Sequence, residues 1–332
     1  MEKKLGIAFA GFRHGHIFGL LSKVLESDKT EFKGGYEQDE NARKAAREKG
    51  ACKWYPSLDE MLADKSVDCV FIGDYYAARG SLAIKALKAH KHIMADKPLC
   101  VTLKEIKEIR RLAKKNDLSV GVMFDMRSMP NVVCAKGIIN SGKIGKVNNI
   151  LFEGQHPLLY GERPDWYFEK GKHGGVINDI AIHAVDLVRM FTDSELKKVD
   201  GARTWNFYAD KVPFFKDSAQ MMFTLGSGAG VIGDVSYAAP NSFEYSLPSY
   251  WNYHIWGSKG MLEFNAVNDG VKVYLNGKTE AETVVPAIPE KNYFDLYIES
   301  IFESRENRNK YTQNTLDSCE QTLIIQSKAE EI

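Results

Sequence analysis

The sequence predicts an α/β protein with two domains: a doubly wound parallel sheet first, then an α+β domain with a large, open and mainly antiparallel sheet. The chain of 332 residues is long for one domain, since domains average about 150 residues. Up to residue 122, short apolar runs alternate with amphipathic stretches, as in repeated strand–helix units. After residue 124, strand-like segments with short glycine and asparagine turns dominate. We therefore expect domains at residues 1–123 and 124–332.

In the first domain, expected strands and helices alternate along the chain. Residues 5–10 form a wholly apolar run, typical of a strand that is buried on both faces. Ser57 with Glu60, and Thr102 with Glu105, have the spacing of a capping box and predict helix starts. The other expected strands cover residues 32–36, 67–72, 92–95 and 118–123, and expected helices follow residue 17, cover 41–49 and 82–87, and run from the Thr102 cap to residue 116.

The second domain mixes helices with strands that follow one another directly. The expected helices cover residues 131–140, 175–191 and 293–303, with a last one from about residue 312. The expected strands cover residues 146–153, 221–225, 230–236, 253–256, 261–264 and 271–274. Short turns between these strands favour antiparallel pairing.

Composition excludes several classes of partner. The 44 basic and 44 acidic residues cancel, so the chain lacks the electrostatic footprint of a protein that binds nucleic acid or an anionic membrane. No stretch approaches the roughly 18 apolar residues of a membrane span. The five cysteines are scattered without a C-x-x-C pair, which favours reduced thiols over a zinc or disulfide framework. These features predict a cytoplasmic protein.

The loop directly after the first strand predicts a dinucleotide site. It contains Gly11, the first glycine of the G-x-G-x-x-G fingerprint, but Arg13 and His16 stand where the second and third would fall. Gly15 and Gly19 could restore the tight turn and close packing in a shifted form, and Arg13 could pair with a phosphate. The alternative is a plain strand–helix turn in which only Gly11 is needed, for its backbone geometry. Loop and context together favour cofactor binding.

A carboxylate at the end of the second expected strand suggests which dinucleotide binds. Glu37 lies somewhat farther from Gly11 than the about 20 residues expected for the acid that holds an adenosine ribose. A carboxylate there accepts hydrogen bonds from both ribose hydroxyls and repels a 2′-phosphate, which favours NAD, with NADP as the alternative. The other interpretation is a solvated acid in the charged run 37–40.

The strongest constellation lies on the long helix expected over residues 175–191. Asp179, His183 and Asp186 are spaced i, i+4 and i+7, so they share one helix face. A histidine between two carboxylates can be oriented and made more basic, as a general base requires. Two alternatives remain: a polar stripe that pins the helix by hydrogen bonds, and a metal site. Metal sites need more convergent ligands than this stretch supplies, and we predict no metal.

Other residues suggest a site for a hydroxylated ligand. Lys97 follows the strand expected over residues 92–95, where partial desolvation lowers a lysine pKa and prepares the group for proton transfer. The alternative is an ordinary surface lysine beside Pro98. Polar and aromatic side chains that could line a polyol pocket are Arg127, His156, Tyr160, Asp165, Trp166 and Tyr167.

The order of these pieces resembles the Gfo/Idh/MocA family of oxidoreductases over nearly the whole chain. The resemblance rests on the N-terminal strand–glycine–helix unit, Lys97 with Pro98, residues 127–130 and 141–146, the helix with Asp179, His183 and Asp186, and residues 256–260. It implies an N-terminal Rossmann domain and NAD(P)-dependent hydride transfer to or from a hydroxyl or ketone carbon of a sugar, inositol or related polyol. By that resemblance Lys97, Asp179 and His183 are catalytic: His183 takes the hydroxyl proton, Lys97 lowers its pKa and Asp179 orients the reacting groups.

The resemblance also implies the remaining contacts. The cofactor-binding residues would be Gly11, Arg13, His14, Gly15, His16, Glu37, Asp74, Tyr75, Arg79, Asp96 and Lys97, and the substrate-binding residues Arg127, His156, Trp166, Asp179 and His183. The exposed face of the second sheet would build a homodimer or homotetramer. Two segments depart from the family pattern: Asp96 replaces a glutamate, and residues 74–79 replace a T-P-x-x-x-H element. The alternatives are a non-catalytic ligand sensor on this fold, and an enzyme that uses tightly bound NAD transiently for epimerisation or glycoside cleavage.

Overall fold

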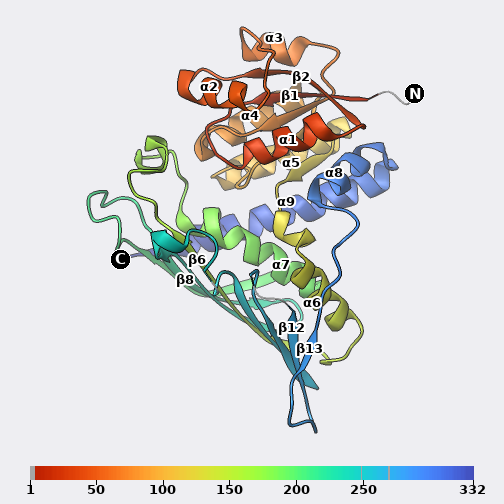
Figure 1. The fold of residues 1–332 in the computed structure, drawn as a ribbon, viewed down its shortest axis with the longest axis vertical. Helices are drawn as coiled ribbons and strands as arrows, with labels where there is room; N and C mark the ends of the chain where they lie inside the picture. The colour runs from red at the N-terminus through yellow and green to blue at the C-terminus, as the bar shows by residue number, and fades with distance from the viewer. Residues whose placement is uncertain (1–3, 248, 268–269) are drawn as a thin grey trace. The chain divides into compact units, whose positions relative to one another are not determined.

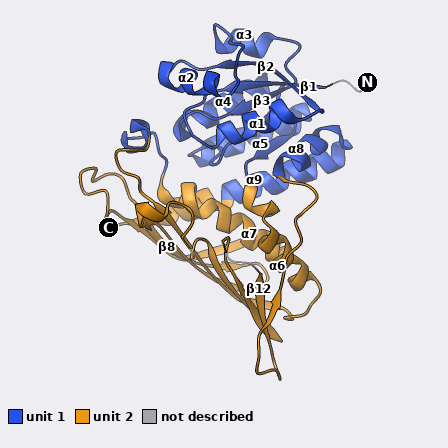
Figure 2. Cartoon of the chain, viewed as in Figure 1, with its two compact units in different colours: residues 1–123, 164–174, 293–320 blue, residues 124–163, 175–292, 321–332 orange. Residues whose placement is uncertain are grey.

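A computed structural model describes residues 4–247, 249–267 and 270–332 (Figure 1). The chain divides into two compact units (Figure 2). The first contains Met1–Met123, Pro164–Gly174 and Tyr293–Glu320, and the second contains Phe124–Arg163, Gly175–Asn292 and Gln321–Ile332. Each unit therefore combines stretches that are separate in the sequence, whereas the sequence predicted two continuous ranges.

The first unit contains a five-stranded, wholly parallel sheet in the order β2-β1-β3-β4-β5. Its strands are β1 (Leu5–Ala10), β2 (Thr30–Tyr36), β3 (Cys69–Ile72), β4 (His92–Ala95) and β5 (Val120–Val122). The helices between them are α1 (Ile17–Glu26), α2 (Glu40–Glu48), α3 (Leu58–Ala63), α4 (Tyr76–Lys88) and α5 (Leu103–Asn116). Because the strand order reverses at β1, right-handed connections place helices on both faces, which confirms the doubly wound fold.

Local sequence signals produce these elements. Every residue of β1 is buried, as its apolar run predicts. Both capping boxes form: the Ser57 hydroxyl accepts a hydrogen bond from the Glu60 amide at 3.1 Å, and the Thr102 hydroxyl accepts one from the Glu105 amide at 3.2 Å. These side chains satisfy backbone donors that the first helical turn leaves unpaired.

A helix from the end of the chain completes the first hydrophobic core. Helix α8 (Tyr293–Phe302) packs Phe294 and Tyr297 against Phe71 of β3, with ring centroids 6.2 and 6.1 Å apart. Helix α9 (Arg305–Lys328) begins earlier than the expected residue 312. Its first turns are polar and show no apolar period, but Arg308 pairs with Asp117 at 3.1 Å. The apolar periodicity of a sequence does not reveal a partner this far away along the chain.

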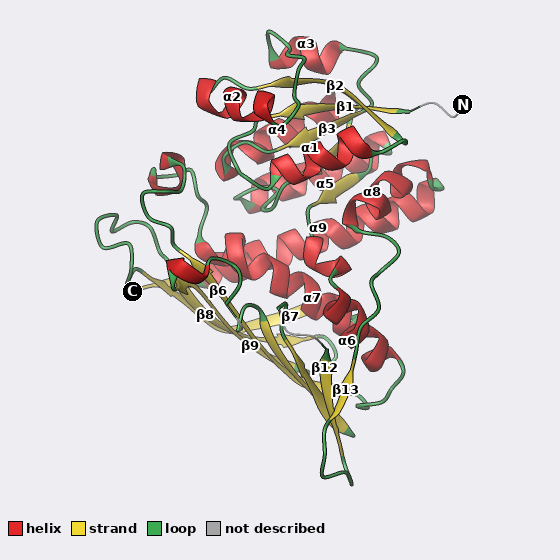
Figure 3. Cartoon of the chain, in the orientation of Figure 1, coloured by secondary structure: helices red, strands yellow, loops and turns green. Residues whose placement is uncertain are grey.

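The second unit is built on a nine-stranded sheet in the order β13-β12-β11-β10-β6-β9-β8-β7-β14. The strands are β6 (Val147–Pro157), β7 (Leu196–Trp205), β8 (Ser218–Leu225), β9 (Gly230–Ala239), β10 (Asn252–Gly257), β11 (Gly260–Phe264), β12 (Val271–Leu275), β13 (Glu282–Val284) and β14 (Glu330–Glu331). Neighbours pair antiparallel except β6 with β9 and β7 with β14, which confirms a mainly antiparallel sheet. Helices α6 (Pro130–Asn140) and α7 (Ile182–Thr192) cover one face (Figure 3).

The two faces of this sheet differ in burial. Phe152, Tyr253 and Leu262 are buried on the face that the helices cover. Met222 and Ile232 pair directly across β8 and β9 and are about half exposed on the other face. Over the part of the chain that the structure describes, no helix is both long and apolar enough to cross a membrane.

Candidate active site

The turn after β1 requires its first glycine. Gly11 has φ +86°, and a Cβ atom built on it would lie 2.6 Å from the backbone nitrogen of Asp74. Gly15 has no atom within 4 Å of such a Cβ and no positive φ. The expectation that Gly15 supplies the tight turn is therefore wrong, because its φ is not positive and no protein atom opposes a Cβ at that position. Gly11 alone gives the tight turn that leads into α1.

Glu37 is buried beside the same turn and stabilises it by hydrogen bonds. Its carboxylate accepts hydrogen bonds from the amides of Phe12 and Asp39, each at 2.7 Å, and from Nε of Arg13 at 3.0 Å. The interpretation as a solvated acid is wrong, because Glu37 is 4% exposed. Arg13 also lies 3.8 Å from Asp39 and 3.9 Å from a carboxylate oxygen of Asp74, so carboxylates surround the guanidinium that was expected to meet a phosphate.

Arg79 holds the segment that follows β4. Its guanidinium is fully buried and donates hydrogen bonds to four backbone carbonyls, those of Asp74, Asp96, Lys97 and Pro98, at 2.6–3.2 Å. It also pairs with the carboxylate of Asp96 at 3.1 Å. Arg79 was expected to contact a cofactor, but in the structure its guanidinium donates hydrogen bonds to oxygen atoms of the protein itself. It positions Asp96 and Lys97.

Asp96 and His14 form a buried pair at the carboxyl end of the parallel strands. The Nδ1 atom of His14 hydrogen-bonds Oδ2 of Asp96, and Nε2 lies 3.2 Å from the hydroxyls of Tyr76 and Tyr167. Burial lowers the pKa of His14 to about 4, more than the Asp96 charge raises it. Burial alone would raise the pKa of Asp96, but His14 and Arg79 hold it well below its ordinary value. At neutral pH the pair is a carboxylate and a neutral imidazole.

Lys97 and Trp166 also lie within the first unit. Lys97 is 3% exposed at the end of β4, which excludes an ordinary surface lysine. Trp166 was expected in a substrate pocket, and the structure places it against the first loop. Its Nε1 donates to the carbonyl of Arg13 at 3.1 Å, and its ring lies 4.9 Å from that of Tyr76 and 6.4 Å from that of Tyr75. Residues 164–174 thus pack on the predicted cofactor loop.

In the second unit, the helix with the predicted catalytic residues begins irregularly. Residues Ile177–Ala181 form a π-helical turn, and α7 follows it. The side-chain carbonyl of Gln326 accepts hydrogen bonds from the amides of Ile177 and Asn178 at 3.2 and 3.3 Å. A Cβ on Gly175 would lie 2.3 Å from that oxygen, so the glycine makes room for the cap. The wider turn changes the geometry that α-helical spacing predicted for Asp179.

Asp179 and His183 have partners that the sequence did not reveal. The hydroxyl of Tyr237 on β9 donates a hydrogen bond to Oδ2 of Asp179. Nδ1 of His183 lies 3.8 Å from Oδ1 of Asp125, which follows β5 in the sequence. Both predicted catalytic side chains are buried. Tyr237 and Asp125 are therefore candidate site residues. Their contacts in the folded chain identify them, and no sequence motif does.

Asp186 does not flank His183 as a free carboxylate. Arg127 donates from Nε to its Oδ2 at 2.6 Å and from Nη2 to its Oδ1. The bidentate pair joins the turn before α6 to α7, and Asp186 is 1% exposed. The interpretation of Asp186 as a residue that pins the helix by hydrogen bonds therefore fits the structure. Arg127 was expected to bind substrate, but its guanidinium forms this ion pair instead.

Aromatic rings surround His156 on β6. Its ring lies 5.4–5.8 Å from those of Tyr245, Tyr250 and Trp251. Trp251 also lies 5.9 Å from the His183 ring. Burial raises the pKa of the Tyr250 phenol, so it stays a neutral hydroxyl at physiological pH. In the second unit both histidine rings therefore lie beside the buried ring of Trp251.

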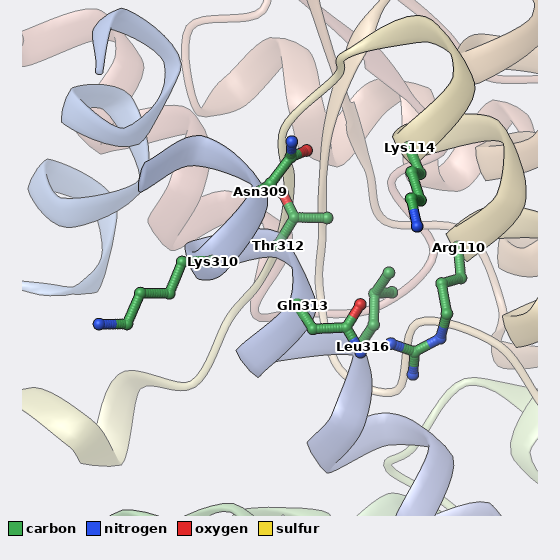
Figure 4. A pocket seen from close by; sticks show the side chains of 7 residues that line it. All are labelled: Arg110, Lys114, Asn309, Lys310, Thr312, Gln313 and Leu316. Atoms are coloured by element: carbon green, nitrogen blue, oxygen red, sulfur yellow. The ribbon is translucent and has the colours of Figure 1, made fainter. Parts of the chain in front are cut away.

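A separate pocket lies in the first unit between α5 and α9 (Figure 4). Its volume is about 310 Å³, and its walls are Arg110, Lys114, Asn309, Lys310, Thr312, Gln313 and Leu316. None of these seven residues belongs to the predicted site. Arg110 is paired with Asp317 at 2.9 Å and Glu320 at 2.6 Å, which neutralises part of the basic wall.

Comparison with known proteins identifies the class. Residues 6–124 match the oxidoreductase family model with an NAD-binding Rossmann fold, and residues 132–263 match the GFO/IDH/MocA C-terminal domain. The chain therefore belongs to the Gfo/Idh/MocA family of oxidoreductases, and its N-terminal domain is an NAD-binding Rossmann domain. The resemblance found in the sequence is confirmed.

Named relatives act on sugars and inositols. D-xylose dehydrogenase of Paenarthrobacter nicotinovorans is 29% identical over 148 residues, 42% of this chain and only 38% of that enzyme. The scyllo-inositol 2-dehydrogenase (NAD(+)) of Bacillus subtilis (strain 168) is 26% identical over 249 residues, 74% of this chain and 69% of that enzyme. A levoglucosan dehydrogenase in complex with NADH and levoglucosan superposes with a TM-score of 0.78 at 20% identity, covering 98% of this chain and 96% of that one, which shows the shared fold.

The first loop fits a dinucleotide. Gly11 provides a turn that no larger residue can adopt without displacing Asp74. The turn leads to the N-terminus of α1, where backbone amides and the helix dipole favour a pyrophosphate. Glu37 and Asp39 add negative charge beside the turn, where an adenosine ribose is bound in this fold.

Proposed function

We propose that the protein is an NAD-dependent dehydrogenase or reductase that acts on a hydroxyl or ketone carbon of a sugar, inositol or related polyol. Membership of the family, together with Lys97, Asp179 and His183 at its catalytic positions, carries the proposal. The printed activities of the relatives, on D-xylose and scyllo-inositol, support this substrate class. The proposal assigns all three residues to one substrate oxygen.

The chain's own groups prepare that oxygen. His183 accepts the proton of the reacting hydroxyl as general base. Lys97 donates a hydrogen bond to the same oxygen, which lowers its pKa and stabilises the negative charge that develops there. Asp179 orients the reacting groups, and the Tyr237 hydrogen bond holds its carboxylate in one position. NAD, when bound, supplies the hydride acceptor, and the protein supplies binding and polarisation.

The first loop and the β2 end select the cofactor. Gly11 and the α1 terminus would hold the pyrophosphate, and Glu37 with Asp39 would repel the 2′-phosphate of NADP. Arg13 is held by these carboxylates, which reduces its availability for that phosphate. We therefore expect NADH to bind more tightly than NADPH.

The aromatic cluster around His156 in the second unit suits a ring polyol. Such a ring has apolar C–H faces and a polar rim of hydroxyls. The exposed Tyr245 and the partly exposed Tyr250 offer ring faces to the C–H groups, while His156 and the Tyr250 hydroxyl offer hydrogen bonds to the hydroxyls. His156 therefore remains our candidate substrate residue, while Arg127 and Trp166 do not.

We further propose a homo-oligomer that forms through the uncovered face of the nine-stranded sheet. Leu151, Met222 and Ile232 lie side by side there on adjacent strands, and Trp256 and Tyr274 extend the apolar surface toward β12. Four of these five are at least one-third exposed. A contiguous apolar patch on a sheet face is typical of a protein–protein interface. A second copy, in a dimer or tetramer, is the proposed occupant.

The cytoplasm remains the proposed location. All five cysteines are free thiols in the structure, and Cys69, Cys100 and Cys319 are buried. Free thiols persist in reducing compartments. Fractionation of cells with an antibody against the chain tests this point.

Initial rates test the proposed reaction. We expect NADH formation when the protein is mixed with NAD and at least one of myo-inositol, scyllo-inositol, D-xylose or levoglucosan. The substitution His183→Gln should lower kcat by at least about 100-fold, because a general base contributes that much or more, while NADH binding is retained. His90→Asn changes an exposed histidine that follows α4, outside the predicted site and the proposed interface, and is the control, with an unchanged rate.

Three outcomes contradict the proposal. A His183→Gln protein with nearly the original rate would remove the assigned base. Saturable NADH binding without turnover on any polyol would favour the ligand-sensor alternative. Copurified NAD that turns over without net reduction would instead favour epimerisation or glycoside cleavage.

A further inference from the structure

We propose that His14, His16 and Asp96 form a binding site for a divalent transition-metal ion. One ligand atom from each of the three lies within 4.8 Å of the other two. Both histidines come from the loop between β1 and α1, and Asp96 directly follows β4. Sequence spacing did not predict the site, because parallel strands bring these separate segments together at their carboxyl ends.

An unsatisfied carboxylate oxygen points to a missing ligand. Asp96 is fully buried, and its Oδ2 pairs with His14 and Arg79. Within the described chain its Oδ1 is buried without a hydrogen-bond partner, and Nδ1 of His16 lies 3.5 Å away. Leaving a buried anionic oxygen unpaired is costly, so such an atom calls for a partner. A cation between Oδ1 and the two imidazoles supplies one.

The outer contacts match those of metal ligands. A metal-bound imidazole usually donates its second N–H to a fixed acceptor. If Nδ1 of His14 binds the ion, its proton belongs on Nε2, which lies 3.2 Å from the hydroxyls of Tyr76 and Tyr167. Arg79 likewise fixes the carboxylate through Oδ2. Each buried ligand therefore already has a second partner that sets its orientation.

The ligand types select the class of ion. Two imidazoles and one carboxylate suit Zn²⁺, Co²⁺ or Ni²⁺, whereas Mg²⁺ and Ca²⁺ prefer oxygen ligands. Ligand atoms about 2.0–2.1 Å from a tetrahedral ion lie roughly 3.3 Å apart. The 3.5 Å between Nδ1 of His16 and Oδ1 of Asp96 is close to this value. The hydrogen bond between Nδ1 of His14 and Oδ2 of Asp96 must open before His14 can bind the ion. The side chain of His16 is 42% exposed, which gives the ion access and leaves positions for water.

The local charge permits a cation. Arg79 places a positive charge near Asp96, but on Oδ2, whereas the proposed ligand is Oδ1. The four backbone carbonyls on this guanidinium, those of Asp74, Asp96, Lys97 and Pro98, offset part of its charge. An ion here also adds positive charge at the loop where two fingerprint glycines are absent. A water molecule or a phosphate oxygen would complete its coordination.

Metal titration of the full-length protein without a histidine tag tests the proposal. The protein is treated with a chelator, and Zn²⁺ is then titrated in competition with a chromophoric chelator. We expect one tight site per chain, and Co²⁺ should give a visible ligand-field spectrum. His16→Gln should weaken Zn²⁺ binding by at least about 10-fold, because it removes a ligand but leaves the buried pair intact.

His254→Gln is the matched control, and we expect it to bind Zn²⁺ as the unmodified protein does. It removes another partly exposed histidine whose Nδ1 lies near a carboxylate, 3.9 Å from Glu263. Circular dichroism and thermal unfolding establish that both variants are folded. Equal affinity in the unmodified protein and His16→Gln overturns the proposal, as does the absence of binding in competition. These results are independent of NADH formation, so failure here leaves the proposed reaction intact.

Discussion

Tyr237 fixes Asp179 through one hydroxyl, which makes the pair a sensitive point of the second unit. Asp179 is 2% exposed, so its carboxylate depends on protein donors. The sequence shows Asp179 and His183 because they share a helix with a recognisable spacing. It does not show Tyr237, which comes from a strand more than fifty residues later. Partners of this kind follow from tertiary structure alone.

Tyr237→Phe tests whether this contact positions Asp179. We expect kcat to fall about 10–150-fold, because one hydrogen bond to a charged group contributes about 1.5–3 kcal/mol. NADH binding and KM should change little. Tyr55→Phe is the control, since it removes a hydroxyl that donates to Asp64 at 2.7 Å, outside the predicted site. An unchanged kcat for Tyr237→Phe, measured in steady state, would show that the contact is only structural.

Arg127→Met tests the structural role of the Arg127–Asp186 pair. The change leaves a buried carboxylate without its cation, and we expect the free energy of unfolding to fall by about 3 kcal/mol. Denaturant titration measures this change. Lys136→Met, which breaks an exposed pair with Asp193, should cost at most about 1 kcal/mol. Normal stability with a raised KM would instead restore Arg127 as a substrate-binding residue.

At the scale of elements, the conformation of the loop between β1 and α1 requires Gly11 but does not require Gly15. Gly11→Ala should weaken NADH binding and lower the free energy of unfolding by about 1–2 kcal/mol or more, since φ +86° and the Asp74 backbone both oppose a Cβ. Gly15→Ala should leave both unchanged. Fluorescence titration and thermal unfolding of the two variants provide the comparison. Similar losses at both positions would contradict the assigned turn.

The elements themselves were largely predictable, and the exceptions have physical causes. The strands of the first sheet are short apolar runs, and the capping boxes mark helix starts, so local sequence determines them. The π-helical turn at Ile177–Ala181 was predicted as α-helix because the Gln326 cap lies far away in the sequence. Edge strands β13 and β14 were not predicted individually, because short, exposed strands lack an alternating apolar face.

At the scale of the whole molecule, the uncovered sheet face predicts assembly. Ile232→Lys places a charge in the middle of the apolar patch, and we expect a smaller species by light scattering after size-exclusion chromatography. Val285→Lys is the control, because Val285 is exposed outside the sheet and should leave the mass unchanged. A mass that stays the same in both variants would place any oligomer interface elsewhere.

The transfer of deuterium tests the central claim most directly. The protein is incubated with NAD and the best polyol of the panel, deuterated at its hydroxyl-bearing carbons, and the NADH produced is examined by mass spectrometry. We predict that NADH carries one deuterium from the polyol and that His183→Gln abolishes its formation while still binding NADH. Saturable cofactor binding without deuterium transfer from any polyol would contradict hydride transfer as the function of this protein.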